Sequence, residues 1–270
     1  MRLFFSGLRK LVRRPASWVT GGLLAGLVAI IIIAIGASAN QSPSRPEAAA
    51  ARQIITFPGA YVQILSFAMG IGGLFAVIYG AAVAGSEWSW GTLKVAVARG
   101  ESRSRYMLLA FASIAVMIGA GLLIVFVVGV LAGLIGANIA GVSTSGLRDT
   151  DTIRSLPRLF ARGWFGVVEE GAIGFAVATL ARSQLAGIGA GIGIYFAETF
   201  ARIFLPHVIK YLPFAVATAG LGVSSGFGGG GGGGRLEQLP ADTALLVAAA
   251  WLVGSLIFVV LFTERAEITG

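Results

Sequence analysis

The stretch YMLLAFASIAVMIGAGLLIVFVVGVLAGLIGANI, residues 106–139, decides the class of fold, because it contains 34 residues and no charged side chain. One helix of that length would measure about 50 Å at 1.5 Å per residue, which exceeds the ~30 Å hydrocarbon core of a bilayer. Two shorter helices that turn near Gly119 to Gly121 are the alternative. Since no polar turn residue interrupts the run, we predict one long membrane helix.

The composition of the whole chain is that of a membrane protein. Of its 270 residues, 56% are hydrophobic, 40 are glycine and only 12% are charged, and the mean hydropathy is +0.87. A soluble domain needs more polar surface to face water. Cysteine is absent, which excludes disulfides, thiol catalysis and cysteine metal sites. The net charge of +8 is explained by topology and by anionic membrane lipid, so we expect no nucleic acid partner.

Five more apolar runs accompany residues 106–139. We predict an all-α membrane protein with one transmembrane domain, residues 1–270, whose six spans are residues 17–37, 59–85, 106–139, 164–181, 184–203 and 243–262. Six spans place both termini on one side of the cell membrane, and the distribution of Arg and Lys favours the cytoplasmic side. Seven spans, with the third run split in two, would strengthen this charge bias and remain the alternative.

Two segments outside the spans have their own character. Residues 1–16 alternate apolar and basic positions at helical spacing, which predicts an amphipathic helix lying in the membrane interface. A signal peptide is the alternative, but the following apolar run is too long for one. Residues 204–241 are predicted to form an extracytoplasmic loop with short re-entrant helices and a glycine-rich stretch, residues 228–234.

Four ionisable residues fall in or near the fourth and fifth runs: Glu169, Glu170, Glu198 and Arg202. The simpler interpretation is that they lie near the outer headgroups and tie the two spans together, with Glu198 and Arg202 paired at i, i+4. The alternative is that Glu169 or Glu170 lines an outward-facing cavity and meets a cationic or amphipathic cargo. Adjacent helical positions point ~100° apart, so no catalytic pair of carboxylates is expected. We expect no metal site either, because the only histidine, His207, has no partner ligands.

Polar residues concentrate in AGSEWSWGTLKVAVARGESRSRY, residues 84–106, between the second and third spans. Ser86 can cap a helix that starts at Glu87. Apolar and basic side chains then alternate, so we predict a short amphipathic helix over residues 86–97, with one face on the membrane and one toward the cytosol. Such a helix is a docking element, and a simple basic loop is the alternative.

The same segment carries a resemblance to a known family. The matching residues are Glu87, Trp88, Gly91, Thr92 and Leu93, followed by Ala98-Arg99-Gly100 and Ser102-Arg103. This pattern resembles the cytoplasmic signature after the second span in permease subunits of ABC-2-type transporters. The basic N-terminal helix, the six spans and the short link ARSQ at residues 181–184 fit the same family. Phe111 stands where many relatives have a lysine, so a role of that lysine does not carry over.

The resemblance implies that residues 86–97 form a coupling helix. It would dock on a separate ATP-binding cassette subunit that holds ATP and Mg, and a second copy of this chain or a homologous permease would complete the pathway. The residues assigned to coupling are Glu87, Trp88, Gly91, Thr92, Leu93, Arg99 and Arg103. The chain has no P-loop, so it is not expected to be an enzyme by itself.

The expected function is therefore ATP-driven export of a hydrophobic or amphipathic cargo such as a lipid, peptide or drug. A non-transporting membrane scaffold or immunity protein that acts by partner binding is the alternative. A secondary transporter is disfavoured, because the sequence lacks internal repeats with interrupted helices at matching positions.

Overall fold

The computed structural model describes residues 2–41, 46–222 and 238–266, apart from the side chains of Arg2, Arg202, Ile203 and Pro206. The regular elements of these ranges are all helices. They are α1 (Arg2–Val12), α2 (Pro15–Gln41), α3 (Pro46–Ile55), α4 (Gly59–Ser89), α5 (Thr92–Ala98), α6 (Arg103–Ile139), the 3-10 helix η1 (Ser145–Arg148), α7 (Thr150–Ala181), α8 (Gln184–Phe204), α9 (Pro206–Ile209), α10 (Pro213–Gly220) and α11 (Ala241–Arg265). The predicted glycine-rich stretch, residues 228–234, lies outside the described residues.

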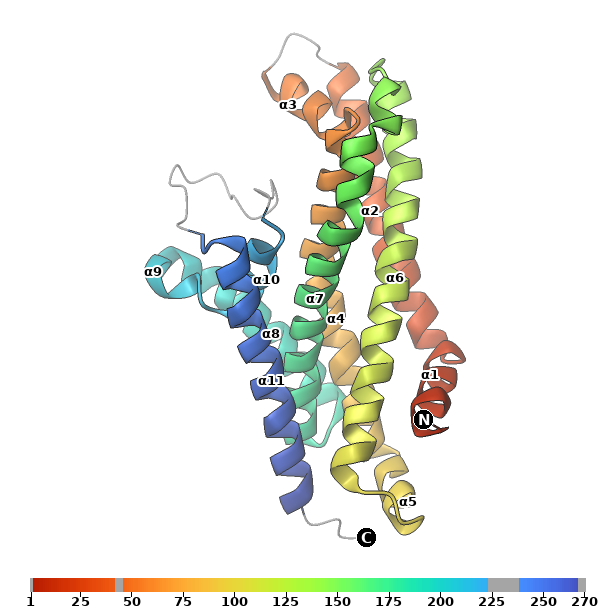
Figure 1. The fold of residues 1–270 in the computed structure, drawn as a ribbon, viewed down its shortest axis with the longest axis vertical. Coiled ribbons are helices and arrows are strands. Elements are labelled where there is room, and N and C mark those ends of the chain that lie inside the picture. The colour runs from red at the N-terminus through yellow and green to blue at the C-terminus, as the bar shows by residue number, and fades with distance from the viewer. Residues whose placement is uncertain (1, 42–45, 223–237, 267–270) are drawn as a thin grey trace.

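The long helices run up and down in one elongated bundle (Figure 1). Helix α2 leads from α1 to α3 at the opposite end of the bundle, α4 returns to α5, and α6 and α7 repeat this path. Helix α1, the short helix α5 and the end of α11 therefore lie toward one end of the molecule, and α3 and the start of α7 lie at the other.

Among the described residues, five helices are long and apolar enough to cross a membrane: α2, α4, α6, α7 and α11. The chain is thus an all-α protein with the character of a multi-pass membrane protein. Helix α8 corresponds to the predicted span 184–203 and has 21 residues, but it is not one of these five. The sixth span stays a prediction.

The third apolar run forms a single helix. Helix α6 has 37 residues and measures about 55 Å at 1.5 Å per residue. It begins after Ser102, whose hydroxyl accepts a hydrogen bond from the backbone N–H of Arg105 at 3.2 Å, which satisfies one of the free donors of the first turn. The prediction of one helix rather than two is confirmed.

Helix α7 begins earlier than the predicted span at residue 164. Its first residue is Thr150, and the carboxylate of Asp149 caps the helix by accepting hydrogen bonds from the backbone N–H of Thr152 at 2.9 Å and from its hydroxyl at 2.5 Å. These bonds lower the pKa of Asp149 below its usual value. Hydropathy marks only the more apolar part of α7, because residues 150–163 mix apolar with polar and charged side chains.

Glycines allow the long helices to approach at backbone distance. On the α4–α7 crossing, a Cβ on Gly80 would collide with the carbonyl oxygen of Gly171, and a Cβ on Gly174 would collide with that of Val77. On the α2–α6 crossing, Gly36 meets Gly136 in the same way. Small residues at helix crossings are the usual means of close packing in membranes, where burial of apolar surface gives little driving force.

Phe111 belongs to the core between α6 and α7. Phe111 is buried, and its ring centroid lies 5.5 Å from that of Phe175 in α7, in an edge-to-face arrangement. The lower part of α6 is therefore joined to α7 by aromatic packing.

Candidate functional site

The turn between α4 and α5 lies at the end of the bundle that also holds α1 (Figure 1). Helix α4 continues through Ser89, and α5 starts at Thr92. Between them Gly91 has φ 67°, a left-handed backbone conformation that glycine adopts without steric cost. Gly91 therefore sets the direction in which α5 leaves α4.

The predicted start of the short helix at Glu87 is wrong. Residues 86–89 are the last turn of α4, and Ser86 does not cap a helix there. Its hydroxyl donates to the carbonyl oxygen of Val83 at 2.8 Å, as a residue in the interior of a helix does. The predicted range 86–97 thus contains the end of one helix, a turn and most of the next helix.

Glu87 is the centre of a buried polar network. Its side chain is 3% exposed, and its Oε1 lies 2.5 Å from Nζ of Lys10 in α1. Its Oε2 accepts a hydrogen bond from the hydroxyl of Tyr106 in α6 at 2.6 Å and another from the hydroxyl of Thr92 in α5. A buried ion pair is stable only when further hydrogen bonds offset the loss of hydration. The two hydroxyls provide them, and the network joins α1, α4, α5 and α6.

A second layer of contacts surrounds this network on the side of α1. The guanidinium of Arg14 donates to the hydroxyl of Ser86 at 3.0 Å and lies 4.7 Å from the ring centroid of Trp90. A cation over an aromatic face adds a modest attraction. Arg14 therefore holds the start of α2 against the end of α4.

Similar contacts join this region to α7 and α11. Arg182, the residue after α7, lies 5.3 Å from the ring centroid of Trp88 and 5.4 Å from that of Phe262 in α11. Arg103, at the start of α6, donates to the carbonyl oxygen of Ala266 at 2.8 Å. The lower end of the bundle is therefore connected through side chains from five of its long helices and from α1.

The outer surface of this region is formed by four residues, which we call the corner face: Trp90, Lys94, Val95 and Arg99. All four are exposed, Trp90 by 63% and Val95 by 51%. The opposite side of α5 is anchored, because Leu93 is only 1% exposed. The corner face thus offers apolar and basic groups to the outside while its helix is fixed from within.

The seven residues predicted for coupling therefore have different environments. Glu87 and Leu93 are buried, and Thr92 bonds to Glu87. Gly91 forms the turn, and Arg99 is exposed. The remaining two contact other parts of the chain: Trp88 lies beside Arg182, and Arg103 donates to Ala266. Sequence analysis missed Lys10 and Tyr106, which complete the network. They lie 77 and 19 positions from Glu87, and no periodic pattern connects such positions.

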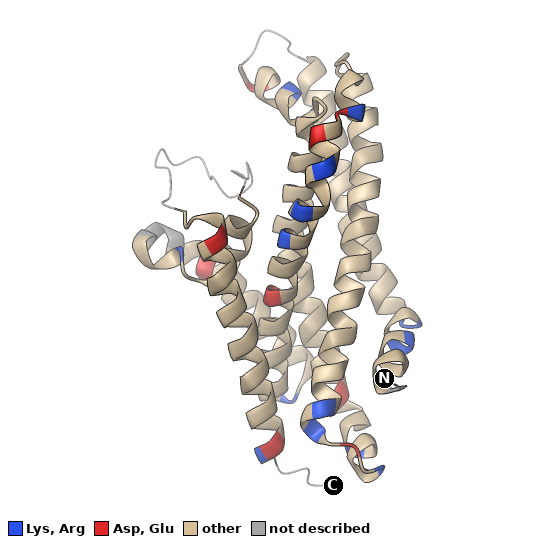
Figure 2. Cartoon of the chain, in the orientation of Figure 1, with Lys and Arg blue, Asp and Glu red and all other residues tan. Residues whose placement is uncertain are grey.

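Figure 2 shows an acidic position in the middle part of α7. Glu169 and Glu170 belong to this part of the helix and are buried, with relative exposures of 0% and 4%. Neither side chain extends to the surface of the bundle, and the predicted position near the outer headgroups stays a prediction. The carboxylate of Glu170 lies against Gly73 of α4, where there is no side chain to displace it. Neither carboxylate oxygen of Glu169 has a hydrogen-bond partner among the described residues.

Glu198 joins α8 to α10. Its carboxylate accepts hydrogen bonds from the backbone N–H groups of Phe214 at 3.1 Å and Ala215 at 2.7 Å, at the start of α10. A negative charge is favourable at a helix N-terminus. The side chain of Arg202 lies outside the described residues, so its predicted pairing with Glu198 stays a prediction.

Glu169 gives a prediction about stability. A buried carboxylate without a hydrogen-bond partner destabilises the fold, so Glu169→Met is expected to raise the free energy of unfolding by about 1–3 kcal/mol. The measurement is the thermal unfolding midpoint of the full chain in detergent. Glu198→Met is the control and is expected to lower the midpoint, because two backbone donors lose their acceptor. A lower midpoint for Glu169→Met would contradict the assignment of Glu169 as unpartnered.

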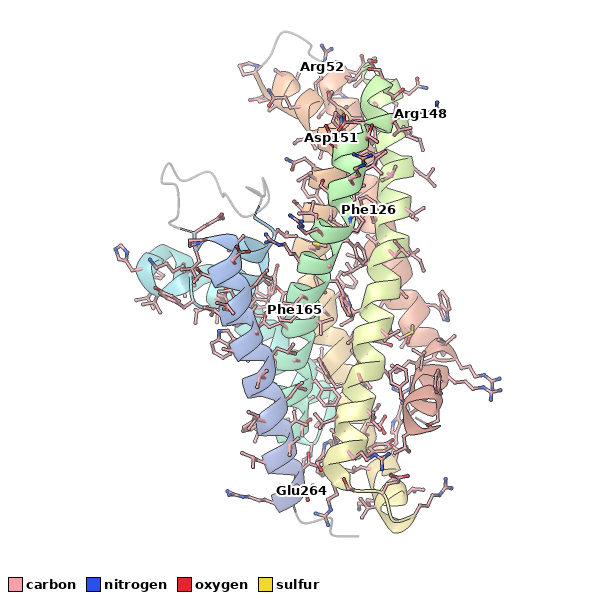
Figure 3. The ribbon with its side chains drawn as sticks, viewed as in Figure 1. Arg52, Phe126, Arg148, Asp151, Phe165 and Glu264 are labelled. Atoms are coloured by element: carbon pink, nitrogen blue, oxygen red, sulfur yellow. The ribbon has the colours of Figure 1, made fainter. Side chains whose placement is uncertain are left out.

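The described part of the chain contains no group of three His, Cys, Asp or Glu side chains arranged to hold a metal ion. Figure 3 shows that the labelled ionisable residues Arg52, Arg148, Asp151 and Glu264 lie at the two ends of the bundle, and that Phe126 and Phe165 lie between them. Two features are candidates for a functional site: the network of Glu87 together with the corner face, and the buried Glu169.

Comparison with known proteins gives a family for this chain. No curated protein matches the sequence significantly. The family described as "Protein of unknown function (DUF2705)" matches residues 28–266, a range that contains the corner face and Glu169 but not α1. Since the match covers most of the sequence, the chain belongs to the DUF2705 family.

Proposed function

We propose that this chain is the membrane-spanning permease subunit of an ATP-driven exporter in the cell membrane. Two permeases, either two copies of this chain or one copy with a homologous permease, would enclose the pathway. A separate ATP-binding cassette subunit would bind ATP and Mg and dock on the corner face. The observation that carries the proposal is the anchored α4–α5 turn, whose outer face is exposed and whose inner face is bonded to two other helices, α1 and α6.

The geometry supports a coupling role because α5 is not an independent loop. A displacement of α5 is passed to α4 by the turn at Gly91, and Glu87 connects the same turn to Lys10 and Tyr106. A bistable permease needs such a connection between the surface that a partner moves and the helices that change position. The contact with the ATPase is then made by the corner face, and Glu87 acts as a positioning residue behind it.

The distribution of charge supports a cytoplasmic location for the α5 end. Basic residues gather there on several elements, and Figure 2 shows this grouping at the start of α6 and on α1: Arg9, Lys10, Arg13, Arg14, Lys94, Arg99, Arg103, Arg105, Arg182 and Arg265. Basic residues also occur near the other end, on α3, η1 and α7, so the bias is moderate. With α6 as one span and α8 as the fifth of six, both termini lie on one side, and the positive-inside rule then favours the cytoplasmic side for them.

The proposed cargo is hydrophobic or amphipathic, because the spans are apolar and few ionisable side chains are buried among the described residues. Glu169 supports an amphipathic cargo with a positive group. Its carboxylate is held in the bundle without a hydrogen-bond partner among the described residues, and membrane proteins commonly retain such groups for transport.

The proposal is tested by placing a charge on the corner face. Val95→Asp is expected to leave the fold intact, because Val95 is 51% exposed, and to reduce co-purification with the proposed ATP-binding cassette subunit by about tenfold or more. The measurement is the amount of ATPase retained by the tagged full chain, together with ATP hydrolysis by the reconstituted pair.

The matched control for this test is Ile153→Asp. Ile153 is 43% exposed and lies near the start of α7, at the opposite end of the bundle. It is expected to behave as the wild type. If Val95→Asp and Ile153→Asp retain equal amounts of ATPase, the corner face is not the docking site. If no ATPase associates with the wild-type chain, a scaffold that binds another kind of partner becomes the better hypothesis.

A further inference from the structure

A cavity of about 320 Å³ lies between α2, α4 and α6 and is independent of the corner face. Its lining includes Trp18, Phe75, Tyr79, Met117, Leu122 and Val125. Two lining residues, Trp18 and Ile124, are 58% and 50% exposed, so the cavity reaches the outer surface of the bundle. All three helices are apolar enough to span a membrane, and this surface therefore faces lipid if they do so.

The cavity is polar at one end and apolar at the other. At the α1–α2 junction, the hydroxyl of Ser17 lies 2.8 Å from the hydroxyl of Tyr79 and also donates to the carbonyl oxygen of Leu11. Toward the middle of the bundle the walls are hydrocarbon, from Leu24 and Leu122 among others. The lining of α2 extends from Ser17 to residue 25, about 12 Å along the helix axis.

Basic residues lie beside the polar end. Val12, the last residue of α1, lines the cavity, and the neighbouring Arg13 is exposed, as is Arg9 one helical turn earlier. Two exposed arginines next to a site with hydroxyl groups suit a phosphate headgroup, and each basic residue near the surface adds to the attraction for an anionic lipid.

We propose that this cavity binds one acyl chain of an anionic phospholipid, with the phosphate of the headgroup at the α1–α2 junction near Arg9 and Arg13. The volume is within the range of specific ligand sites. The cavity has hydroxyl groups and positive charge at one end and hydrocarbon walls at the other, which matches the headgroup and the acyl chain of a phospholipid. The proposal requires only that the three helices lie in a bilayer, and it does not rest on the exporter function.

The glycines of the cavity provide variants that fill it without a clash. Both Gly21 and Gly121 line the cavity, and a Cβ at either position meets no atom within 4 Å. Gly21→Leu and Gly121→Leu therefore occupy the space that an acyl chain would take. Gly26→Leu is the matched control, because Gly26 also has no atom within 4 Å of such a Cβ and does not line the cavity.

The binding experiment uses the purified full chain in an uncharged detergent and phosphatidylglycerol with brominated acyl chains, which quench tryptophan fluorescence on contact. The contribution of Trp18 is the difference between each protein and the same protein with Trp18→Phe. We expect saturable quenching of Trp18 in the wild type. We expect at least fivefold weaker binding for Gly21→Leu and for Gly121→Leu, each tested separately, and wild-type binding for Gly26→Leu.

The headgroup is tested with brominated phosphatidylcholine, which has the same chains and no net charge. It is expected to bind several-fold more weakly than phosphatidylglycerol. Arg9→Gln and Arg13→Gln are expected to weaken phosphatidylglycerol binding by about fivefold each and to leave phosphatidylcholine unchanged. Equal quenching by the two lipids, or cavity-filling variants that behave as Gly26→Leu, would overturn the proposal. Because no ATPase is present, these outcomes leave the test at Val95 unaffected.

Discussion

Replacing Glu87 with alanine is expected to lower the free energy of unfolding of the full chain by about 1–3 kcal/mol. The substitution removes the partner of Lys10 and the acceptor of the Tyr106 and Thr92 hydroxyls, three groups that are partly buried around the carboxylate. The side chain of Lys10 is 33% exposed and can be hydrated once its partner is gone, so the main loss is that of the hydrogen bonds to the Glu87 carboxylate. The measurement is the unfolding midpoint in detergent, compared with that of the wild type.

The control for this prediction is Glu101→Ala in the same segment. Glu101 is partly exposed, so its removal is expected to change the free energy of unfolding by no more than about 0.5 kcal/mol. The double variant Lys10→Met/Glu87→Met tests the mechanism, because removing both charges leaves neither unpaired, and it is expected to be more stable than Glu87→Met alone. A midpoint for Glu87→Ala equal to that of Glu101→Ala would contradict the buried network.

Variants of the corner face and of the Glu87 network test docking and coupling separately. Val95 lies on the outer face, and its replacement acts on the contact with the partner. Glu87→Gln keeps the size of the side chain and one acceptor oxygen but loses the charge that pairs with Lys10. Under the proposed function, the Glu87→Gln variant still co-purifies with the ATPase. It changes the rate of ATP hydrolysis by the ATPase less than the wild-type permease does. Loss of retention in Glu87→Gln would place Glu87 in the docking surface itself.

The membrane-type fold was predictable because charge-free runs leave few alternatives. Residues 106–139 became α6 with a difference of three residues at its start and none at its end. Helix α7 was predictable only in part, because its first fourteen residues, 150–163, mix apolar with polar and charged side chains and hydropathy does not mark them. The local signal for its start was present, since Asp149 and Thr152 have the spacing of a helix cap.

The candidate site was predictable in position but not in environment. The pattern at residues 86–97 located the turn between two spans, but its periodicity was interpreted as one helix. Helix α4 ends at Ser89, and the chain changes direction at Gly91. Glu87 is therefore a residue of α4, and its side chain is buried. The partners of Glu87 are set by the packing of α1 and α6 on α4, and that packing depends on side-chain shapes far apart in the sequence.

Replacing Gly174 with leucine is expected to disrupt the crossing of α4 and α7 and to lower the free energy of unfolding by about 3 kcal/mol or more. A Cβ at Gly174 would collide with the carbonyl oxygen of Val77, and a backbone atom cannot move away as the end of a flexible side chain can. The helices would have to separate along a contact that also includes Gly80 and Gly171. The measurement is the unfolding midpoint together with the yield of monodisperse protein from membranes.

The matched control is Gly189→Leu in α8, where a Cβ meets no atom within 4 Å, and it is expected to retain the wild-type midpoint and yield. Gly80→Leu tests the same crossing from α4 and should reproduce the loss, because its Cβ would collide with the carbonyl oxygen of Gly171. If both substitutions on this crossing behave like Gly189→Leu, the two helices do not meet at these glycines. Glu170 would then no longer be expected to lie against Gly73, because both residues belong to the same crossing.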